Sequence, residues 1–227
     1  MVRWRKAVAE FLGTAALIFI GAGAVIMNHH TLGGVGLVGI ALAHGLTVGV
    51  MVSAIGHISG GHINPAVTAA FLATGRLSVR DGAWYIGAQL VGGVVGALLL
   101  QACFPPAAVV AAFVGTPMLA EGVTAMAGIL IELLLTFLLV FTVFATAVDP
   151  QGAFKAIAGY GIGTVVAIDI LAGGPLTGAA MNPARAFGPA VVANIWHHQF
   201  VYWMGPIGGG ILAGLLYHHL FLRGRRS

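Results

Sequence analysis

Charged side chains are scarce in this sequence. The 227 residues include 10 Lys or Arg and 6 Asp or Glu, together 7% of the chain. A soluble domain carries about 25%, so this composition excludes an ordinary water-soluble fold. Instead, 59% of the residues are hydrophobic and the mean hydropathy is +1.00. These values are typical of an integral membrane protein, in which each spanning helix needs about 20 mostly apolar residues.

Cysteine is nearly absent too, because Cys103 is the single one, which excludes an internal disulfide. The His pairs at 29–30, 197–198 and 218–219 lie at the ends of apolar stretches, where amphipathic rings are common, so neither a metal site nor a cofactor is expected. No nucleophile elbow is present that would indicate an enzyme.

Six stretches are long and apolar enough, or nearly so, to span a membrane: residues 7–27, 35–55, 83–103, 125–148, 156–172 and 200–222. With the first tail inside, nine of the ten basic residues fall on one side: Arg3, Arg5, Lys6, Arg76, Arg80, Lys155, Arg223, Arg225 and Arg226. The positive-inside preference puts that side, with both termini, in the cytoplasm, so the net charge of +4 predicts topology and no nucleic-acid partner. Short loops and a minimal tail favour a prokaryotic plasma membrane.

The chain contains an internal repeat. AEFLGTAALIFIGAG (9–23) parallels IELLLTFLLVFTVFA (131–145), which pairs Glu10 with Glu132. Each half holds three spans, an odd number, so the second half is inverted relative to the first. We expect a single domain, with a first repeat of about 1–103, a connecting loop of about 104–121 and a second repeat of about 122–227.

Asn-Pro-Ala occurs twice, in SGGHINPAVT (59–68) and in TGAAMNPARA (177–186). Each copy begins a segment of about 16 Å as a helix, half of the hydrocarbon thickness. Asn is a strong N-cap and Pro suits the first helical turn, so each motif predicts a half-helix, and the inverted repeat makes the two meet near the midplane. The irregular loops before them are tolerated inside a membrane only where protein buries them or they line a watery cavity.

These motifs, the paired glutamates and the six spans resemble the aquaporin (major intrinsic protein) family over nearly the whole chain. The resemblance implies an all-α membrane protein with six transmembrane helices and two re-entrant half-helices, assembled in the lipid bilayer as a homotetramer. It also implies a channel, not an enzyme, that passes water and small neutral solutes and excludes protons and ions.

The pore chemistry follows from the motif residues, which are Asn64, Pro65, Ala66, Asn182, Pro183 and Ala184. Half-helix N-termini carry partial positive charge that opposes cations, and the two Asn amides donate hydrogen bonds to a water oxygen. Pore-lining carbonyls are expected from Gly60, Gly61, His62, Ile63, Gly178, Ala179, Ala180 and Met181. Glu10 and Glu132 are expected to be structural acceptors for the loop backbones, since a proton relay would not explain their equivalent places.

Arg185 is the one basic residue placed at membrane depth, where a charge costs about 2.5–3.5 kcal/mol. In the family this arginine forms the narrowest constriction, and its companions map by spacing onto His44, Ile170 and Ala179. That set is similar to the filters of plant tonoplast aquaporins and mammalian relatives that pass ammonia, so ammonia is expected, and hydrogen peroxide and urea are plausible. Asp169 has no assigned role: pairing with Arg185 or a neighbouring span, or a place at the outer interface, stay open.

Three alternatives stay open beside this interpretation. A strict water channel would have the same motifs with a filter that is closed to ammonia. A glycerol facilitator typically has Asp directly after the motif arginine and a Pro-aliphatic pair in the sixth span, where this chain has Ala186 and Tyr202-Trp203. A secondary transporter also uses inverted repeats and broken helices, but it needs a coupling-ion site that the sequence does not indicate.

Overall fold

The computed structural model describes residues 2–152 and 155–222. Within these residues the secondary structure is helical, with no strand. Arg223, Arg225 and Arg226 lie outside the described residues, as does the side chain of Lys155.

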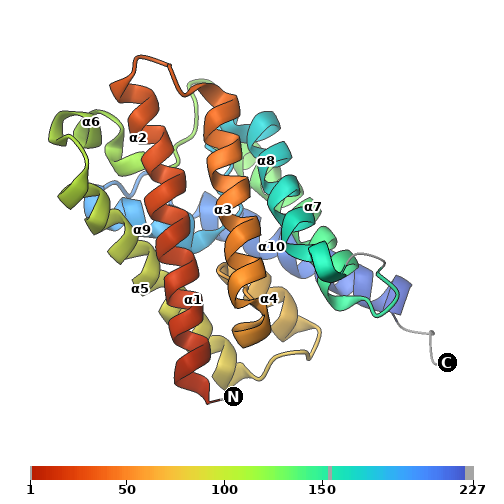
Figure 1. Cartoon of the computed structure of the whole chain (residues 1–227). Coiled ribbons are helices and arrows are strands. Elements are labelled where there is room, and N and C mark those ends of the chain that lie inside the picture. Colours follow the sequence, from red (N-terminus) through yellow and green to blue (C-terminus); the bar gives the residue numbers. More distant parts are fainter. Residues whose placement is uncertain (1, 153–154, 223–227) are drawn as a thin grey trace.

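Six long helical segments cross the molecule, as predicted (Figure 1). They are α1 (Arg3–Leu17), continued by the π-helical turn η1 (Ile18–Ala22) and α2 (Gly23–His30); α3 (Gly36–Ser59); α5 (Val79–Cys103); α7 (Ala125–Val143), continued by η3 (Phe144–Val148); α8 (Ala158–Thr177); and α10 (Val201–Tyr217), continued by η5 (His218–Leu222). Among the described residues, five of these segments have the length and hydropathy of a membrane span. The sixth, α10, has 17 residues before its π-helical turn.

The two Asn-Pro-Ala motifs begin short helices, as their cap chemistry predicts. α4 (Pro65–Ala73) follows Asn64, whose side chain accepts a hydrogen bond from Ala66 N, and α9 (Pro183–Ala193) follows Asn182, which caps Ala184 N in the same way. With 9 and 11 residues, the two helices extend about 14 and 16 Å. Their summed length matches the hydrocarbon thickness of about 30 Å.

The packing of the helices follows the inverted repeat. α1 lies against α5 as α7 lies against α10, while α4 packs on α10 and α9 packs on α5, so each half-helix contacts a span of the other half. Glycines permit these contacts: a Cβ on Gly93 would lie 2.7 Å from the Ala184 carbonyl, and one on Gly210 would lie 2.7 Å from the Ala66 carbonyl. Close backbone approach at small residues is typical of packing between membrane helices.

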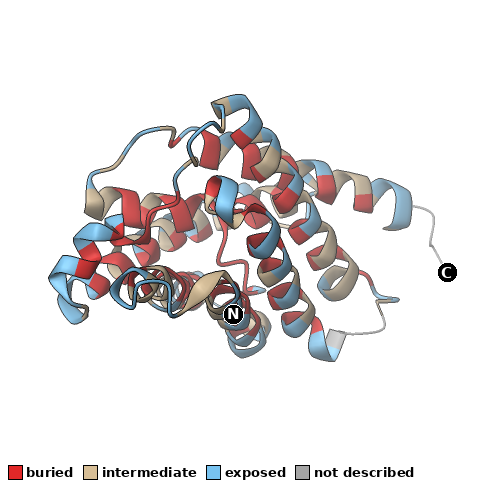
Figure 2. Ribbon diagram, turned by 90° about the horizontal axis from the view of Figure 1, so that it is seen from above, coloured by how far each residue is buried: buried red, intermediate tan, exposed pale blue. Residues whose placement is uncertain are grey.

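The outer faces of the helices are apolar. Figure 2 shows buried faces turned toward one another and exposed faces turned outward. Large hydrophobic side chains with more than 40% exposure occur on every long helix, among them Val38, Val50, Leu130, Ile168 and Leu212. An exposed apolar surface fits a protein whose outer face contacts lipid.

The connecting segment contains helices that the sequence did not predict. Residues 104–121 were expected to be a loop, but they include α6 (Pro106–Ala111) and the 3-10 turn η2 (Phe113–Gly115). Val109 and Val114 pack into a buried cluster with Ile18 and Ala22 of the first span. The connecting segment is therefore part of the core beside the first span. Elsewhere in the chain, a second 3-10 turn, η4 (Lys155–Ile157), precedes α8.

Candidate functional site

Two irregular loops enter the centre of the molecule, at residues 60–63 and 178–181. Their backbone is left-handed at Gly60, Gly61 and Ile63 in the first loop, and at Gly178, Ala179 and Met181 in the second. This region costs a non-glycine residue roughly 1–2 kcal/mol, so the loops need external support. Seven of the eight residues that were predicted to supply pore-lining carbonyls line one central cavity. The eighth, Gly178, lines a second, outer cavity.

Glu10 supplies the support for the first loop. Its carboxylate is buried and accepts hydrogen bonds from the backbone N–H groups of His62 (2.9 Å) and Ile63 (2.5 Å). The Ser59 hydroxyl (2.6 Å) and the Gln89 amide (2.8 Å) donate to the same carboxylate. Four donors around one buried carboxylate hold the loop backbone in a conformation that it would not adopt alone.

Glu132 occupies the equivalent place in the second half. Its carboxylate accepts from the backbone N–H groups of Ala180 (2.9 Å) and Met181 (2.7 Å) and from the Thr177 hydroxyl (2.7 Å). A tyrosine adds a further tie in each half: Tyr85 donates to the Ser59 carbonyl (2.6 Å), and Tyr202 donates to the Thr177 carbonyl (2.8 Å). Two backbone N–H bonds, one hydroxyl bond and one tyrosine bond thus recur in both halves.

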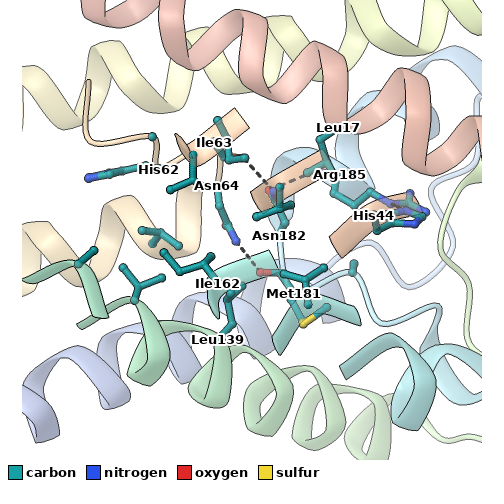
Figure 3. A pocket seen from close by; sticks show the side chains of 18 of the residues that line it. Leu17, His44, His62, Ile63, Asn64, Leu139, Ile162, Met181, Asn182 and Arg185 are labelled. Carbon is teal, nitrogen blue, oxygen red and sulfur yellow. Dashed lines mark hydrogen bonds between the residues drawn. The ribbon is translucent and has the colours of Figure 1, made fainter. Parts of the chain in front are cut away.

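The two motif asparagines cross-link the loops at the centre (Figure 3). Asn64 Nδ2 donates to the Met181 carbonyl, and Asn182 Nδ2 donates to the Ile63 carbonyl, each at 2.9 Å. Both asparagine oxygens cap their half-helices. Each Nδ2 carries two hydrogens, so one N–H per asparagine is left for a molecule in the cavity that both residues line.

Arg185 has defined partners although its side chain is buried. Its Nε donates to His44 Nε2 (3.2 Å), and its Nη1 donates to the Gly115 carbonyl (2.9 Å). His44 Nδ1 lies 2.9 Å from the Ile40 carbonyl. Because Nε2 receives a proton donor and Nδ1 faces an acceptor, the network assigns the neutral tautomer with the proton on Nδ1.

The four predicted filter residues, His44, Ile170, Ala179 and Arg185, line the same central cavity. An outer cavity, lined in part by the connecting segment and His29, lies next to it. Three residues line both cavities: His44, Ile170 and Arg185. These three side chains therefore lie at the boundary between the two cavities, where a permeating molecule would have to pass.

Comparisons with known proteins show the family of the chain. A family model described as "Major intrinsic protein" matches residues 1–217. The chain belongs to the major intrinsic protein family. It is 47% identical to "Aquaporin TIP4-4" of Zea mays over 96% of this chain and 87% of that protein, and 42% identical to "Aquaporin-4" of Mus musculus over 96% and 68%.

A solved structure supports the fold of this family member. The aquaglyceroporin from Plasmodium falciparum superposes with a TM-score of 0.86 at 24% identity, covering 96% of this chain and 97% of that one. Membership of the family makes the protein a multi-pass membrane channel. The relatives named here come from a plant, a mammal and a protozoan, and they give no support to a prokaryotic source.

The structure decides one of the alternatives left open for Asp169 and adds one residue to the site. Asp169 is 1% exposed, and it does not pair with Arg185, whose two described side-chain bonds go to His44 and to the Gly115 carbonyl. Sequence reasoning missed Gly115, because it binds through its backbone carbonyl and carries no side-chain signal. In the sequence, Gly115 is marked only by its place in the connecting segment between the two repeats.

Proposed function

We propose that this major intrinsic protein conducts water and ammonia through the cavity between its half-helices and excludes protons and ions. The observation that carries the proposal is the boundary between the two cavities. It is formed by His44, Ile170 and Arg185, with Ala179 on its inner side. A histidine, an aliphatic residue, a small residue and an arginine leave a less hydrated passage than a filter with a second polar side chain in the place of Ile170.

The hydrogen bonds of Arg185 explain how a charge and an ammonia path can coexist. The guanidinium has five N–H groups, and two donate to His44 and to the Gly115 carbonyl. These bonds hold the guanidinium against the wall formed by α3 and the connecting segment. The remaining N–H groups can donate to the lone pair of water or ammonia, whereas the positive charge repels ammonium.

His44 contributes to the passage through its ring surface. Both of its ring nitrogens have protein partners, namely the Ile40 carbonyl and Arg185 Nε. A passing solute therefore meets the ring mainly as a wall, and its polar contacts come from Arg185 and from the loop carbonyls. This role fits a small neutral solute, because ammonia needs one donor and few acceptors.

Proton exclusion is assigned to the centre of the pore. The N-termini of α4 and α9 each carry about half a positive charge, and both motif asparagines belong to the wall of this cavity. The free N–H of Asn64 and that of Asn182 would bind one water oxygen and turn its hydrogens away from the midpoint. A chain of proton-hopping waters is interrupted there, and a cation meets a positive potential.

The same filter residues bear on the other solutes and on the alternative functions. Hydrogen peroxide and urea are proposed as secondary solutes. A strict water channel is the nearest alternative, and a glycerol facilitator is less favoured because Ala186 follows the arginine. A secondary transporter is the remote alternative, and nucleic acid and cofactors have no proposed role.

The assembly and orientation are proposals as well. We propose a homotetramer in the lipid bilayer, with both termini cytoplasmic and one channel domain per chain, made of repeats at about 1–103 and 122–227. The two repeats share the carboxylate anchors and the crossed asparagine bonds, which supports the single-domain organisation. A prokaryotic plasma membrane stays a prediction from loop length alone.

The substitution Ile170→His tests the proposal in proteoliposomes. A polar ring in place of Ile170 adds hydrogen-bonding groups to the boundary between the two cavities. We expect ammonia-driven alkalinisation to slow toward the rate of empty vesicles while osmotic shrinkage stays fast. If the wild type shows no ammonia flux above empty vesicles, or if Ile170→His lowers both fluxes equally, the assigned filter is wrong.

A further inference from the structure

The first span is interrupted by a π-helical turn beside the proposed filter. The turn η1 comprises Ile18–Ala22 and lies between α1 and α2. Such turns are rare within α-helices and occur frequently at functional sites. Neither the pore motifs nor the proposed function accounts for this one.

Gly21, within this turn, lies directly against the His44 ring. A Cβ built on Gly21 would be 2.5 Å from His44 Cδ2, 2.7 Å from Nε2 and 2.9 Å from Cγ. Real Cβ atoms do not approach other atoms this closely, so any larger residue at position 21 must displace the ring. The ring cannot move along its own helix without breaking the hydrogen bond between Nδ1 and the Ile40 carbonyl.

Ala22, the next residue of the turn, contacts the second group that holds Arg185. A Cβ on Gly115 would lie 2.8 Å from Ala22 Cβ and 2.9 Å from the Ala22 carbonyl oxygen. Gly115 also has a φ of 72°, in the left-handed region that favours glycine. Two consecutive residues of η1 therefore contact the two groups that accept hydrogen bonds from Arg185. Gly21 contacts the His44 ring, and Ala22 contacts the Gly115 backbone.

The turn itself is held in place. Ile18 and Ala22 are fully buried and pack with Val109 and Val114 of the connecting segment. A rigid turn between two acceptors sets the distance between them, and that distance fixes where a planar guanidinium can bind both.

We propose that the π-helical turn Ile18–Ala22 is a positioning element of the filter, in which Gly21 sets the place of the His44 ring and thereby draws Arg185 out of the pore axis. The inference rests on the proposed function of His44 and Arg185. Gly21 touches no permeant and acts through His44. A residue with a Cβ at position 21 would push the ring toward the passage and break the bond from Arg185 Nε.

A double-mutant cycle tests this role. Gly21→Ala is made in the wild type and in a His44→Ala background, where the ring that would collide is gone. In the wild type we expect ammonia permeability to fall about tenfold, which corresponds to a barrier increase of about 1.4 kcal/mol, and water permeability to fall by less. In the His44→Ala background the same substitution should change either flux by less than about twofold, since the two residues then have no contact to couple them.

The matched control is Gly87→Ala, an exposed position on α5 where a Cβ would meet nothing within 4 Å. It makes the same chemical change in a membrane helix and should leave both fluxes unchanged. Equal losses from Gly21→Ala in both backgrounds would mean a general packing defect and would overturn the proposal. An unchanged wild-type flux after Gly21→Ala would overturn it as well.

Folding serves as the readout if Gly21→Ala cannot be reconstituted. Recovery of folded protein in Gly21→Ala with His44→Ala would support the steric pair, and failure of the double variant would contradict it. The water fluxes of the four proteins in the cycle distinguish a failure of this inference from a failure of the proposed function. A wild type that passes water without ammonia refutes the proposed function, yet the water fluxes still decide the role of Gly21.

Discussion

Replacing Glu132 with Gln tests whether an ionised carboxylate holds the second pore loop. Glu132 Oε1 accepts from Thr177 and Ala180, and Oε2 accepts from Met181 N. A carboxamide retains one oxygen, and its best orientation keeps the two bonds at Oε1 while its NH2 faces the Met181 N–H. One charge-assisted hydrogen bond is lost, which costs about 1.5–3 kcal/mol. We therefore expect Glu132→Gln to destabilise the protein by about that amount.

Thermal unfolding of the purified protein in detergent measures this loss. For a chain of this length, 1 kcal/mol lowers the midpoint by about 2–4 °C, so the expected shift is roughly 3–12 °C. Water permeability should fall too, because the Met181 carbonyl accepts the bond from Asn64. Glu121→Gln, at an exposed acid, is the control. An unchanged midpoint with full permeability would refute the reasoning, since it would mean that Glu132 carries a proton or does not hold the loop.

Three further substitutions have defined outcomes. His44→Phe removes the acceptor of Arg185 Nε and should suppress ammonia flux while sparing water; equal loss of both in stopped-flow traces would contradict its role. Mercury should not block the wild type, because Cys103 is exposed and is not among the cavity-lining residues, whereas Ala179→Cys should become mercury-sensitive in osmotic shrinkage assays. Gly188→Ala should prevent or severely weaken folding, since its Cβ would collide with the Gly93 backbone, and recovery of normal amounts of stable protein would count against that packing.

The half-helices and their anchors could be predicted because their signals are local. Asn before Pro specifies an N-cap followed by a first turn, and Glu10 with Glu132 stands out as a repeated acid in apolar spans. These local patterns sufficed for the fold, which the family match and the structural neighbour confirm.

The support of the filter could not be predicted, because it depends on contacts without side-chain signals. The acceptor at Gly115 is a backbone carbonyl in a segment that looked like a plain loop, and the contact at Gly21 consists of a missing Cβ. Asp169 shows the opposite case: its side chain is conspicuous in the sequence, yet the structure buries it with no hydrogen-bond partner for Oδ2 among the described residues.

We propose that one pore carries both water and ammonia without protons. The experiment that tests this proposal records internal pH after an ammonium gradient and light scattering after an impermeant osmotic step, in the same proteoliposome preparation and against empty vesicles. We expect both rates to rise, and an imposed proton gradient to decay no faster than in empty vesicles. Fast shrinkage with an unchanged rate of alkalinisation would contradict it and would leave a strict water channel.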